Sequence, residues 1–523
     1  MNGLRLVGVG LLGLVALPAV AAPSPSSYMP ADATLVLSIP SPAQTLKRAE
    51  KLAAQAGLAP PGAAAGWLEQ TLHEQVPPTA SIDMSKPLAF GIAPKAGSKV
   101  ADIDAKDFRA VLVLGVKGKG DGLAELIPDG KSRIEKGWMI STIGEGLGKP
   151  LKASFQSPKS ASTLEKRSDV TLHVDMKRMK LPDADAKTAA LQDALAVGLG
   201  LGATGLDIFT QSFPDPKGPM AKMNRSLKPT SDPIITGLPA MAYAAVFGTV
   251  GSPNATDTSL VDQYGSLLGP MLDEISPKLA PLLLKVAKTG LETGSCERSS
   301  FAVLLPGALE KLELLGAATG CEKAAAKVAA TTDSVKELNE LVQIAEEYME
   351  DPIPLRFAKV AKPTKAGGTT FSGLQIVPAS KKTAADAKAL FSDFPMLEQP
   401  LLLGTAGKKS LAYAWNAPSA QLGALVKSAA KGGPTPTGDF AVAKKQLVSP
   451  RSAEGYVQLG SLATPFLTEE LAPLSMLLKT LPPLAFASRT FDDGSNLAQI
   501  WVPSQLAQLG IMGAQLAAAA SQK

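Results

Sequence analysis

The chain has 523 residues, of which 45% are hydrophobic, so it is long enough for sizeable buried cores and is not disordered as a whole. Lysine and arginine number 52 against 47 aspartate and glutamate, and only 5% of the residues are aromatic, which argues against a nucleic-acid binder. With two cysteines and two histidines, zinc ribbons and iron–sulfur centres are excluded, and we expect no metal and no other cofactor.

The first residues have the features of a secretory signal. Arg5 precedes an apolar run from Leu6 to Leu17, Pro18 interrupts the run, and Ala19-Val20-Ala21 fits a cleavage site. We predict a signal peptide over residues 1–21 and a periplasmic or secreted protein, with an uncleaved N-terminal anchor as the alternative. A later uncharged stretch of small and apolar residues, Ala194 to Leu206, is too short to cross a bilayer, and its glycines suggest a loop. We therefore expect no transmembrane segment after the signal.

The first half of the mature chain alternates strands with helices. Residues 22–27 are rich in serine and proline and are expected to be flexible. The alternation of apolar and polar residues from Val170 to Met176 predicts a half-buried strand with His173 on its solvent face. The other predicted elements are helices at Gln44–Gln55 and around Trp67–Val76, and strands at Thr34–Ile39, Leu88–Ala93, Phe108–Val116 and Trp138–Ile143.

Similar blocks recur in the same order in the second half. The matched pairs, each strand with its flanking residues, are 30–33 with 239–242, 88–94 with 301–306, 137–142 with 410–415, and 169–175 with 454–460. We therefore predict an α+β fold of two diverged repeats, residues 28–213 and 237–503, each an antiparallel sheet covered by helices. A linker over 214–236 joins them and a C-terminal helix follows over 504–523. Coincidence among short apolar strands is the alternative.

Two further patterns lie in the second half. Apolar residues from Leu260 to Ile275 recur at helical spacing and predict a long amphipathic helix. Asp492-Asp493-Gly494 separates two apolar strands, which is typical of a tight hairpin turn.

The block from Pro30 to Leu52, a Pro-Ala-Asp-Ala sequence followed by a strand and an amphipathic helix, resembles a family of uncharacterised exported bacterial proteins, a domain of unknown function. The resemblance covers the rest of the chain only by the order of its blocks. It implies alternating strands and helices after a signal or anchor segment. It implies no catalytic residue and no cofactor.

Two short motifs match those of known enzymes. The glycines from Gly200 to Gly205 have the spacing of a dinucleotide-binding loop, but a helical segment at Ala189–Val197 precedes them and a strand at Leu206–Phe209 follows. That order is inverted, so we interpret them as a helix C-cap and turn. Ser428 and Lys431, with Lys288-Thr289-Gly290, match motifs of penicillin-recognising enzymes in the wrong order, and we interpret them as coincidence.

The remaining ionisable residues do not form a recognisable catalytic pattern. His73 and His173 are expected to be surface histidines. The acidic residues from Asp333 to Asp351 are interleaved with leucines at helical spacing, which predicts a solvated helix face and not a calcium loop. Residues 131–187 carry 12 basic against 7 acidic residues, but these are scattered without aromatic partners.

These observations favour an exported, non-catalytic protein of the bacterial envelope that acts by binding. The expected partner is another envelope protein or an apolar ligand held between a sheet and leucine-rich helices, and nucleic acid is not expected. A secreted hydrolase of unrecognised type, or a peripheral membrane or lipid-binding protein, is the alternative. No catalytic residue can be named, and the ligand and oligomeric state stay open.

Cys296 and Cys321 are the only cysteines, and an exported protein meets oxidising conditions. Strands at Phe301–Leu305 and Leu312–Leu315 flank a turn that begins at Pro306-Gly307. A hairpin centred between Ala308 and Leu309 places Val303 opposite Leu314. The same register places the two cysteines opposite each other, within disulfide reach.

We predict that these cysteines form a disulfide, which for a loop of about 25 residues stabilises the fold by about 3.5 kcal/mol. Thiol labelling of the denatured, unreduced exported protein should detect no reactive thiol. Two labelled thiols per chain would refute the bond.

Overall fold

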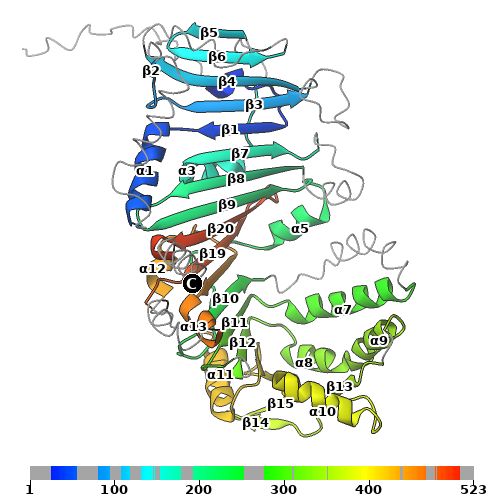
Figure 1. Ribbon diagram of the computed structural model, residues 1–523. Coiled ribbons are helices and arrows are strands. Elements are labelled where there is room, and N and C mark those ends of the chain that lie inside the picture. Colours follow the sequence, from blue (N-terminus) through cyan, green and yellow to red (C-terminus); the bar gives the residue numbers. More distant parts are fainter. Residues whose placement is uncertain are drawn as a thin grey trace, which may run out of the picture.

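The computed structural model describes residues 25–55, 81–94, 108–117, 131–144, 147, 154–177, 193–251, 276–308, 311–349, 352–435, 440–466, 478 and 480–506. Within these residues the fold is mixed, with a large antiparallel sheet of twenty strands and about ten helices (Figure 1). No helix in this part of the chain is both long and apolar enough to cross a membrane.

The first half of the chain supplies one end of the sheet. Its strands lie side by side in the order β5-β6-β4-β3-β1-β7-β8-β9, and β2 adds to β4. Their bounds are β1 Leu35–Ile39, β2 Ser81–Ile82, β3 Leu88–Pro94, β4 Phe108–Lys117, β5 Lys131–Glu135, β6 Trp138–Ile143, β7 Val170–Asp175, β8 Ala194–Leu201 and β9 Gly205–Phe213.

The second half supplies the other end. Its strands follow the order β20-β19-β18-β10-β11-β12-β17-β16-β15-β13, and β14 pairs with β15. Their bounds are β10 Ala245–Val250, β11 Arg298–Leu304, β12 Glu313–Thr319, β13 Leu355–Lys359, β14 Thr364–Ala366, β15 Thr369–Pro378, β16 Leu401–Thr405, β17 Ser410–Trp415, β18 Ala453–Val457, β19 Leu484–Thr490 and β20 Asn496–Pro503.

Helices connect and cover the strands. α1, α3 and α11 pack on one face of the sheet, α8 packs on β15 to β17 and α9 on β13, and α7 contacts both α8 and α9 beside the second half. The bounds are α1 Pro42–Gln55, α3 Ser162–Arg167, α5 Pro219–Ser226, α7 Leu279–Gly294, α8 Ala324–Asp333, α9 Val335–Glu346, α10 Ala384–Asp393, α11 Ser419–Lys431, α12 Ala441–Lys444 and α13 Leu459–Ala463, with 3-10 turns η1 Pro25–Tyr28, η4 Lys159–Ala161, η6 Pro395–Glu398 and η8 Thr464–Phe466.

The two halves meet where β9 pairs with β20, which we call the central seam. The pairing runs from Gly205 opposite Pro503 to Ser212 opposite Asn496, so the backbone hydrogen-bond ladder passes from one half into the other. The main hydrophobic cluster also crosses the seam, with Leu164 and Phe209 from the first half and Trp501 from the second. One hydrophobic cluster therefore spans the seam, whereas β1, β3, β4 and β6 pack on a separate cluster.

Successive side chains of a strand point to opposite faces. On the covered face, the one that carries α1, α3 and α11, residues such as Val36, Phe209, Trp501, Val246 and Leu315 are at most 4% exposed. The other face, which we call the open face, carries the alternate residues, and most of them are only half-buried.

A buried polar network lies under the central seam on the covered face. The Gln499 side chain donates from Nε2 to Asp207 Oδ1 at 2.6 Å and to the Gln446 carbonyl at 2.9 Å. Its Oε1 accepts from the Val448 backbone N–H at 2.6 Å. One side chain thus ties β9, β20 and the chain before β18 together, which satisfies polar groups that would otherwise be costly to bury.

The structure contradicts two sequence expectations for the segment around Ala194–Leu201. Ala194–Leu201 is strand β8, although we expected helix up to Val197 and a loop around the glycines. Leucine and valine of β8 lie on the open face while alanine and glycine fit closely under α3, so small residues on one face hide the alternation that marks a strand.

Other expected segments have the following outcomes. Pro25–Tyr28 is a short 3-10 turn with Tyr28 buried, where we expected a flexible segment. The linker over 214–236 contains α5. The expected helices around Trp67–Val76 and Leu260–Ile275 lie outside the described residues. So do residues 507–523 of the expected C-terminal helix and the signal peptide.

The two faces of β20 give a stability prediction. Trp501→Ala removes a side chain that is 1% exposed at the seam and should lower the free energy of unfolding by about 3–5 kcal/mol. Ile500→Ala, the matched control on the open face at 38% exposure, should cost no more than about 2 kcal/mol. Urea unfolding followed by circular dichroism measures both. Equal losses would contradict the assignment of the faces.

Candidate functional site

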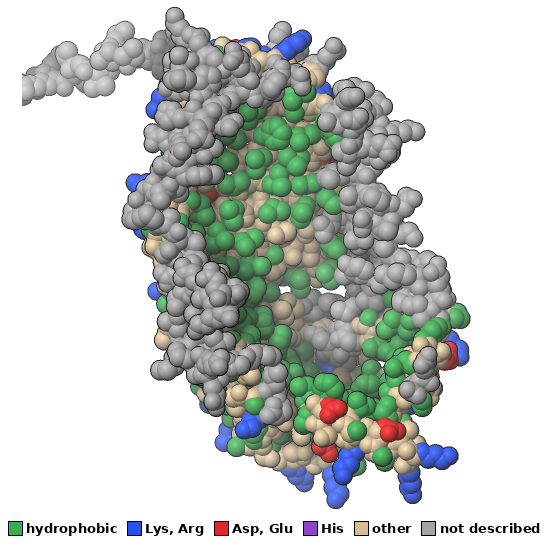
Figure 2. All heavy atoms as spheres, viewed as in Figure 1, with side chains coloured by type: hydrophobic (Ala, Val, Ile, Leu, Met, Phe, Trp, Pro, Cys, Tyr) green, Lys and Arg blue, Asp and Glu red, His purple; other side chains and the backbone are tan. Residues whose placement is uncertain are grey.

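A row of apolar side chains crosses the open face from one half to the other. Cross-strand pairing places Leu199 beside Ile208, Ile208 beside Ile500, and Ile500 beside Phe486. The row continues through Gly455 to Phe247 and Phe301. Leu199 is 36% exposed, Ile500 38% and Phe301 43%, so the row is accessible from outside the sheet. Figure 2 shows this face as a broad apolar area that is hollowed along its middle.

Glycines make room for aromatic rings on the open face. Phe247 stacks on Phe301 with ring centroids 4.9 Å apart, and a Cβ at Gly455 would lie 2.3 Å from the Phe247 ring. A Cβ at Gly316 would lie 1.8 Å from the Tyr413 ring. Both rings therefore lie flat across a neighbouring strand, and any larger residue at either glycine would displace them.

Charged residues are nearly absent from this face, where the register places Lys359 of β13 at the outer end of the second half. From the register, every open-face position of the described strands β1, β3, β4, β6 to β12 and β15 to β20 holds an uncharged residue. The covered face of the same strands holds His173, Asp207, Glu313 and Glu454. This distribution is unusual, because polar residues normally stand on the more exposed face of an antiparallel sheet.

A stripe of small polar side chains lies beside the apolar row on the open face. Thr210, Ser488, Thr249 and Ser299 belong to one cross-strand line, in which Ala498 and Ala453 separate some of them. Ser488 Oγ donates to Asn496 Oδ1 at 2.7 Å. An uncharged polar group of a ligand could find hydrogen-bond partners here, next to the apolar row.

The open face ends where α8 packs over β15, β16 and β17. Cys296, Cys321, Ala318 and Ala324 form a small buried cluster there, against Leu411. The structure brings the two cysteine sulfurs to disulfide distance, with Cα atoms 4.3 Å apart. The expected register is confirmed, because Val303 pairs with Leu314. The cysteines flank the β11–β12 hairpin, and β11 is separated from β20 at the central seam by β10, β18 and β19.

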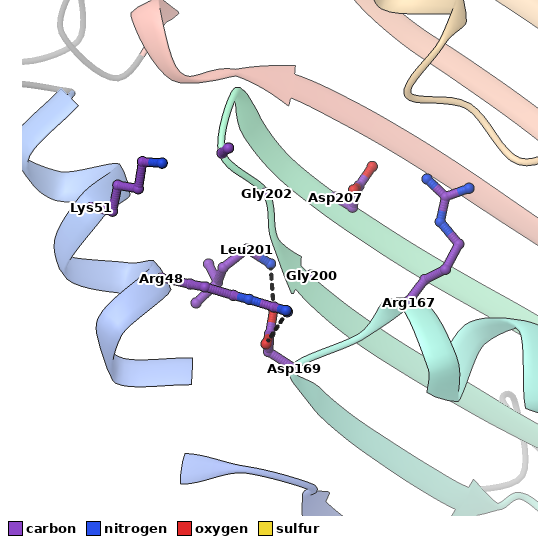
Figure 3. A pocket seen from close by; sticks show the side chains of 9 residues that line it. Arg48, Lys51, Arg167, Asp169, Gly200, Leu201, Gly202 and Asp207 are labelled. Carbon is purple, nitrogen blue, oxygen red and sulfur yellow. Dashed lines mark hydrogen bonds and ion pairs between the residues drawn. The ribbon is translucent and has the colours of Figure 1, made fainter. Parts of the chain in front are cut away.

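A charged cleft of about 450 Å³ opens on the covered side, between α1 and the β8–β9 turn (Figure 3). Asp169 is 6% exposed; it accepts hydrogen bonds from Arg48 at 2.8 Å and from the Leu201 backbone N–H at 2.7 Å. Lys51 points toward Gly202 on the same side of the cleft. The carboxylate of Asp169 therefore holds the hairpin turn against α1.

The far side of the cleft carries Arg167 and Asp207. Burial is the main cause that raises the pKa of Asp207 above its usual value, and the Gln499 hydrogen bond opposes it. Arg167 lies over the Phe209 ring at 5.6 Å and donates to the Gln446 carbonyl. Most charges of the cleft are thus engaged within the protein, and their contacts are those of a structural junction.

The glycine motif from Gly200 to Gly205 lies in this cleft, but it does not form a phosphate-binding loop. The segment is the hairpin turn between β8 and β9, and Gly202 donates its N–H to the Gly205 carbonyl at 2.9 Å. A Cβ at Gly200 would lie 2.5 Å from the Arg167 carbonyl, and one at Gly205 would lie 2.3 Å from the Val502 carbonyl. Close backbone packing accounts for these glycines.

The position of His173 differs from the sequence expectation. His173 is 6% exposed on the covered face of β7, not on a solvent face, and its ring lies 5.5 Å from that of Phe155. Its Nε2 is 3.1 Å from Glu165 Oε1. This hydrogen bond is the main cause that lowers the pKa of Glu165, while partial burial opposes it. The apolar residues of β7 occupy the open face instead. His73 lies outside the described residues.

The other motifs are not assembled into a site. Ser428 and Lys431 stand on α11, whereas Lys288 and Thr289 stand on α7, in a different part of the fold. The acidic residues after Asp333 are spread over α8 and α9, where Glu337 pairs with Lys285 at 2.7 Å and Glu346 with Arg356 at 2.6 Å. Across the described part of the chain no three histidine, cysteine or acidic residues gather as a metal site.

Comparisons with family models, with curated proteins and with solved structures found no match to this chain. The open face is therefore the feature from which a function must be argued. Sequence reasoning named an apolar ligand between a sheet and helices, but it missed that the accessible apolar surface lies on the sheet itself. The near absence of charged residues from the open-face positions could be recognised only after the strand register was known.

The Glu165–His173 contact gives a pH prediction. Because the pKa of Glu165 is below its ordinary value of 4.5 in the folded protein, the stabilisation is present above about pH 4.5 and is lost as pH falls through the lowered pKa. Glu165→Gln should therefore melt below the wild type at pH 7, with the difference shrinking toward pH 3. Glu322→Gln, at an exposed glutamate, is the control. A difference independent of pH would contradict the assignment.

Proposed function

We propose that this protein is an exported, non-catalytic binding protein of the bacterial envelope, and that its ligand is an uncharged amphiphile with long acyl chains. The observation that carries the proposal is the uncharged open face with its accessible apolar row. Water-exposed apolar surface is unfavourable by about 25 cal/mol per Å², so covering side chains such as Leu199, Ile500 and Phe301 would drive binding.

The dimensions and chemistry of the open face fit acyl chains. Neighbouring strands are about 4.8 Å apart. In the order of the sheet, the ten strands β3-β1-β7-β8-β9-β20-β19-β18-β10-β11 therefore extend for roughly 40 Å. One leaflet of a bilayer core is about 15 Å deep, so the row is longer than one acyl chain. The hydroxyl stripe of Thr210, Thr249 and Ser299 would accept an ester or glycerol group beside the chains.

A charged lipid is disfavoured along the apolar row because the open-face positions of β8, β9, β20, β19, β18, β10 and β11 offer no counter-charge. The prediction of export rests on the N-terminal sequence, and periplasm and outer surface stay equal alternatives. A hydrolase would need a nucleophile or a pair of activated carboxylates facing the ligand. The described open face carries hydroxyls but neither carboxylates nor histidines, which favours binding over catalysis.

We also propose that the fold arose by duplication of one α+β unit. The strand order β5-β6-β4-β3-β1-β7-β8-β9 has its counterpart in β16-β17-β12-β11-β10-β18-β19-β20. One pair of sequence blocks precedes the corresponding strands β1 and β10, and the other three pairs fall on β3 and β11, β6 and β17, and β7 and β18. The two series then join through equivalent last strands, so the open face of each unit would supply half of the ligand surface.

Binding of a pyrene-labelled monoacylglycerol to delipidated protein tests the ligand proposal. The wild type should bind saturably, and Ile500→Glu should weaken binding at least about tenfold, because the new carboxylate would lie in the apolar row. The matched control is Val442→Glu, which changes an apolar residue that is 56% exposed on α12. Its affinity should equal that of the wild type.

Circular dichroism must show that all three proteins are folded. If the wild type fails to bind the probe, or if both variants bind as tightly as it does, the open face is not an acyl-chain site. Extraction of lipid from protein purified out of its native envelope would then identify no bound amphiphile either.

A further inference from the structure

The open face changes in polarity along one cross-strand line. From β9 across the second half this line is the hydroxyl stripe, whose members are Thr210, Ser488, Thr249 and Ser299. In the other direction the strand register continues the same line from Thr210 to Val197 of β8, Leu172 of β7 and Leu37 of β1. The line is therefore aliphatic over the first half and carries hydroxyls from β9 onward.

Counterpart strands of the two halves show the same contrast. Every open-face position of β1, β7 and β8 is leucine, isoleucine or valine, and none of these side chains is buried. The corresponding strands β10, β18 and β19 place Thr249, Gly455 and Ser488 on this face. An aliphatic surface favours contact with hydrocarbon, whereas hydroxyls can satisfy the polar groups of a ligand.

The hydroxyls of the stripe are accessible to a ligand. Thr210 and Thr249 are exposed, and Ser299 is half-buried. Within the described residues these three hydroxyls have no hydrogen-bond partner in the protein, whereas Ser488 donates to Asn496. Each hydroxyl offers one donor and two acceptor positions. The stripe can therefore donate to, and accept from, a ligand that carries hydroxyls of its own.

Aromatic rings lie beside the stripe on the same strands. Phe247 lies two residues before Thr249 on β10, and Phe301 lies two residues after Ser299 on β11. Phe301 is 43% exposed. A sugar ring has C–H groups on its faces and hydroxyls around its rim, and the electron-rich face of an aromatic ring attracts such C–H groups. A sugar that contacts Phe301 could thus reach Ser299 with its hydroxyls.

We propose that the ligand of the open face is a neutral glycolipid, with its sugar head on the hydroxyl stripe and its acyl chain on the first half. This inference rests on the proposed function and adds the class of head group and the direction of binding. Five strand spacings separate Thr210 from Ser299, which is roughly 24 Å. A glycerol group covers only a fraction of that length, whereas a head of several sugar units would use it.

The aliphatic part of the line is long enough for the chain. From Thr210 the line crosses β8, β7 and β1 and reaches Phe90 on β3, four strand spacings away, which is roughly 19 Å. One leaflet of a bilayer core is about 15 Å deep, so an acyl chain fits on this segment. The head and the chain therefore do not compete for the same part of the open face.

Displacement of the pyrene-labelled monoacylglycerol by two competitors tests the proposal. Dodecyl maltoside has a sugar head, and tetraethylene glycol monododecyl ether has the same chain and a neutral head that ends in a single hydroxyl. Both are used below their critical micelle concentrations. The wild type should bind the maltoside at least about tenfold more tightly than the ether, because each added hydrogen bond contributes a factor of about two to ten.

Two nearly isosteric variants separate the roles of the halves. Thr249→Val combined with Ser299→Ala removes two hydroxyls of the stripe and should reduce the preference for the maltoside at least about fivefold. Val197→Thr, the reciprocal control, puts a hydroxyl into the aliphatic segment and should weaken both competitors by a similar factor, so that the preference stays. Circular dichroism must show that both variants are folded.

The outcomes distinguish this inference from the proposed function. If the wild type binds the ether as tightly as the maltoside, or if the preference persists in the folded stripe variant, the glycolipid assignment is wrong although the acyl-chain site stands. If Val197→Thr abolishes the preference, the sugar lies on the first half and the direction of binding is wrong. If the wild type binds neither the pyrene probe nor the competitors, the proposed function itself is contradicted.

Discussion

The pairing of β9 with β20 is the constraint on which the rest of the structure depends. It joins two strand series that would otherwise each end in an unpaired edge, and an unpaired edge invites association with other chains. Because the backbone hydrogen bonds between β9 and β20 fix the register of the two halves, the apolar rows on their open faces align into one. Gln499 and Trp501 secure the same strand from the covered side, through a polar network and through the core.

The distribution of polarity between the two faces follows from that arrangement. On the covered face, Glu454 is buried and Asp207 is half-buried, and both carboxylates are hydrogen-bonded, which fixes how helices and loops dock. The open face carries mainly uncharged residues that are only half-buried. Contact of these apolar side chains with water is unfavourable, so an apolar partner that covers them would lower the free energy. A single sheet thereby separates the part that stabilises the fold from the part to which we assign ligand binding.

Carboxylates on the covered side of the sheet position neighbouring groups. Asp169, Glu165 and Glu454 each have a donor at hydrogen-bond distance, and each positions a turn, a histidine or an arginine.

The sequence by itself determined the local elements and one long-range contact. Alternation and turn residues located strands such as β1, β6 and β20, and the distance of Cys296 and Cys321 from the hairpin turn fixed the register that brings them together. It could not decide which face of β7 is buried, because His173 reads as polar until Glu165 and Phe155 are found beside it. Nor could it show β8 as a strand, since alanine and glycine on one face and leucine and valine on the other give no polar alternation. Only the tertiary structure decided these points, because burial and pairing across the seam depend on contacts between residues far apart in the chain.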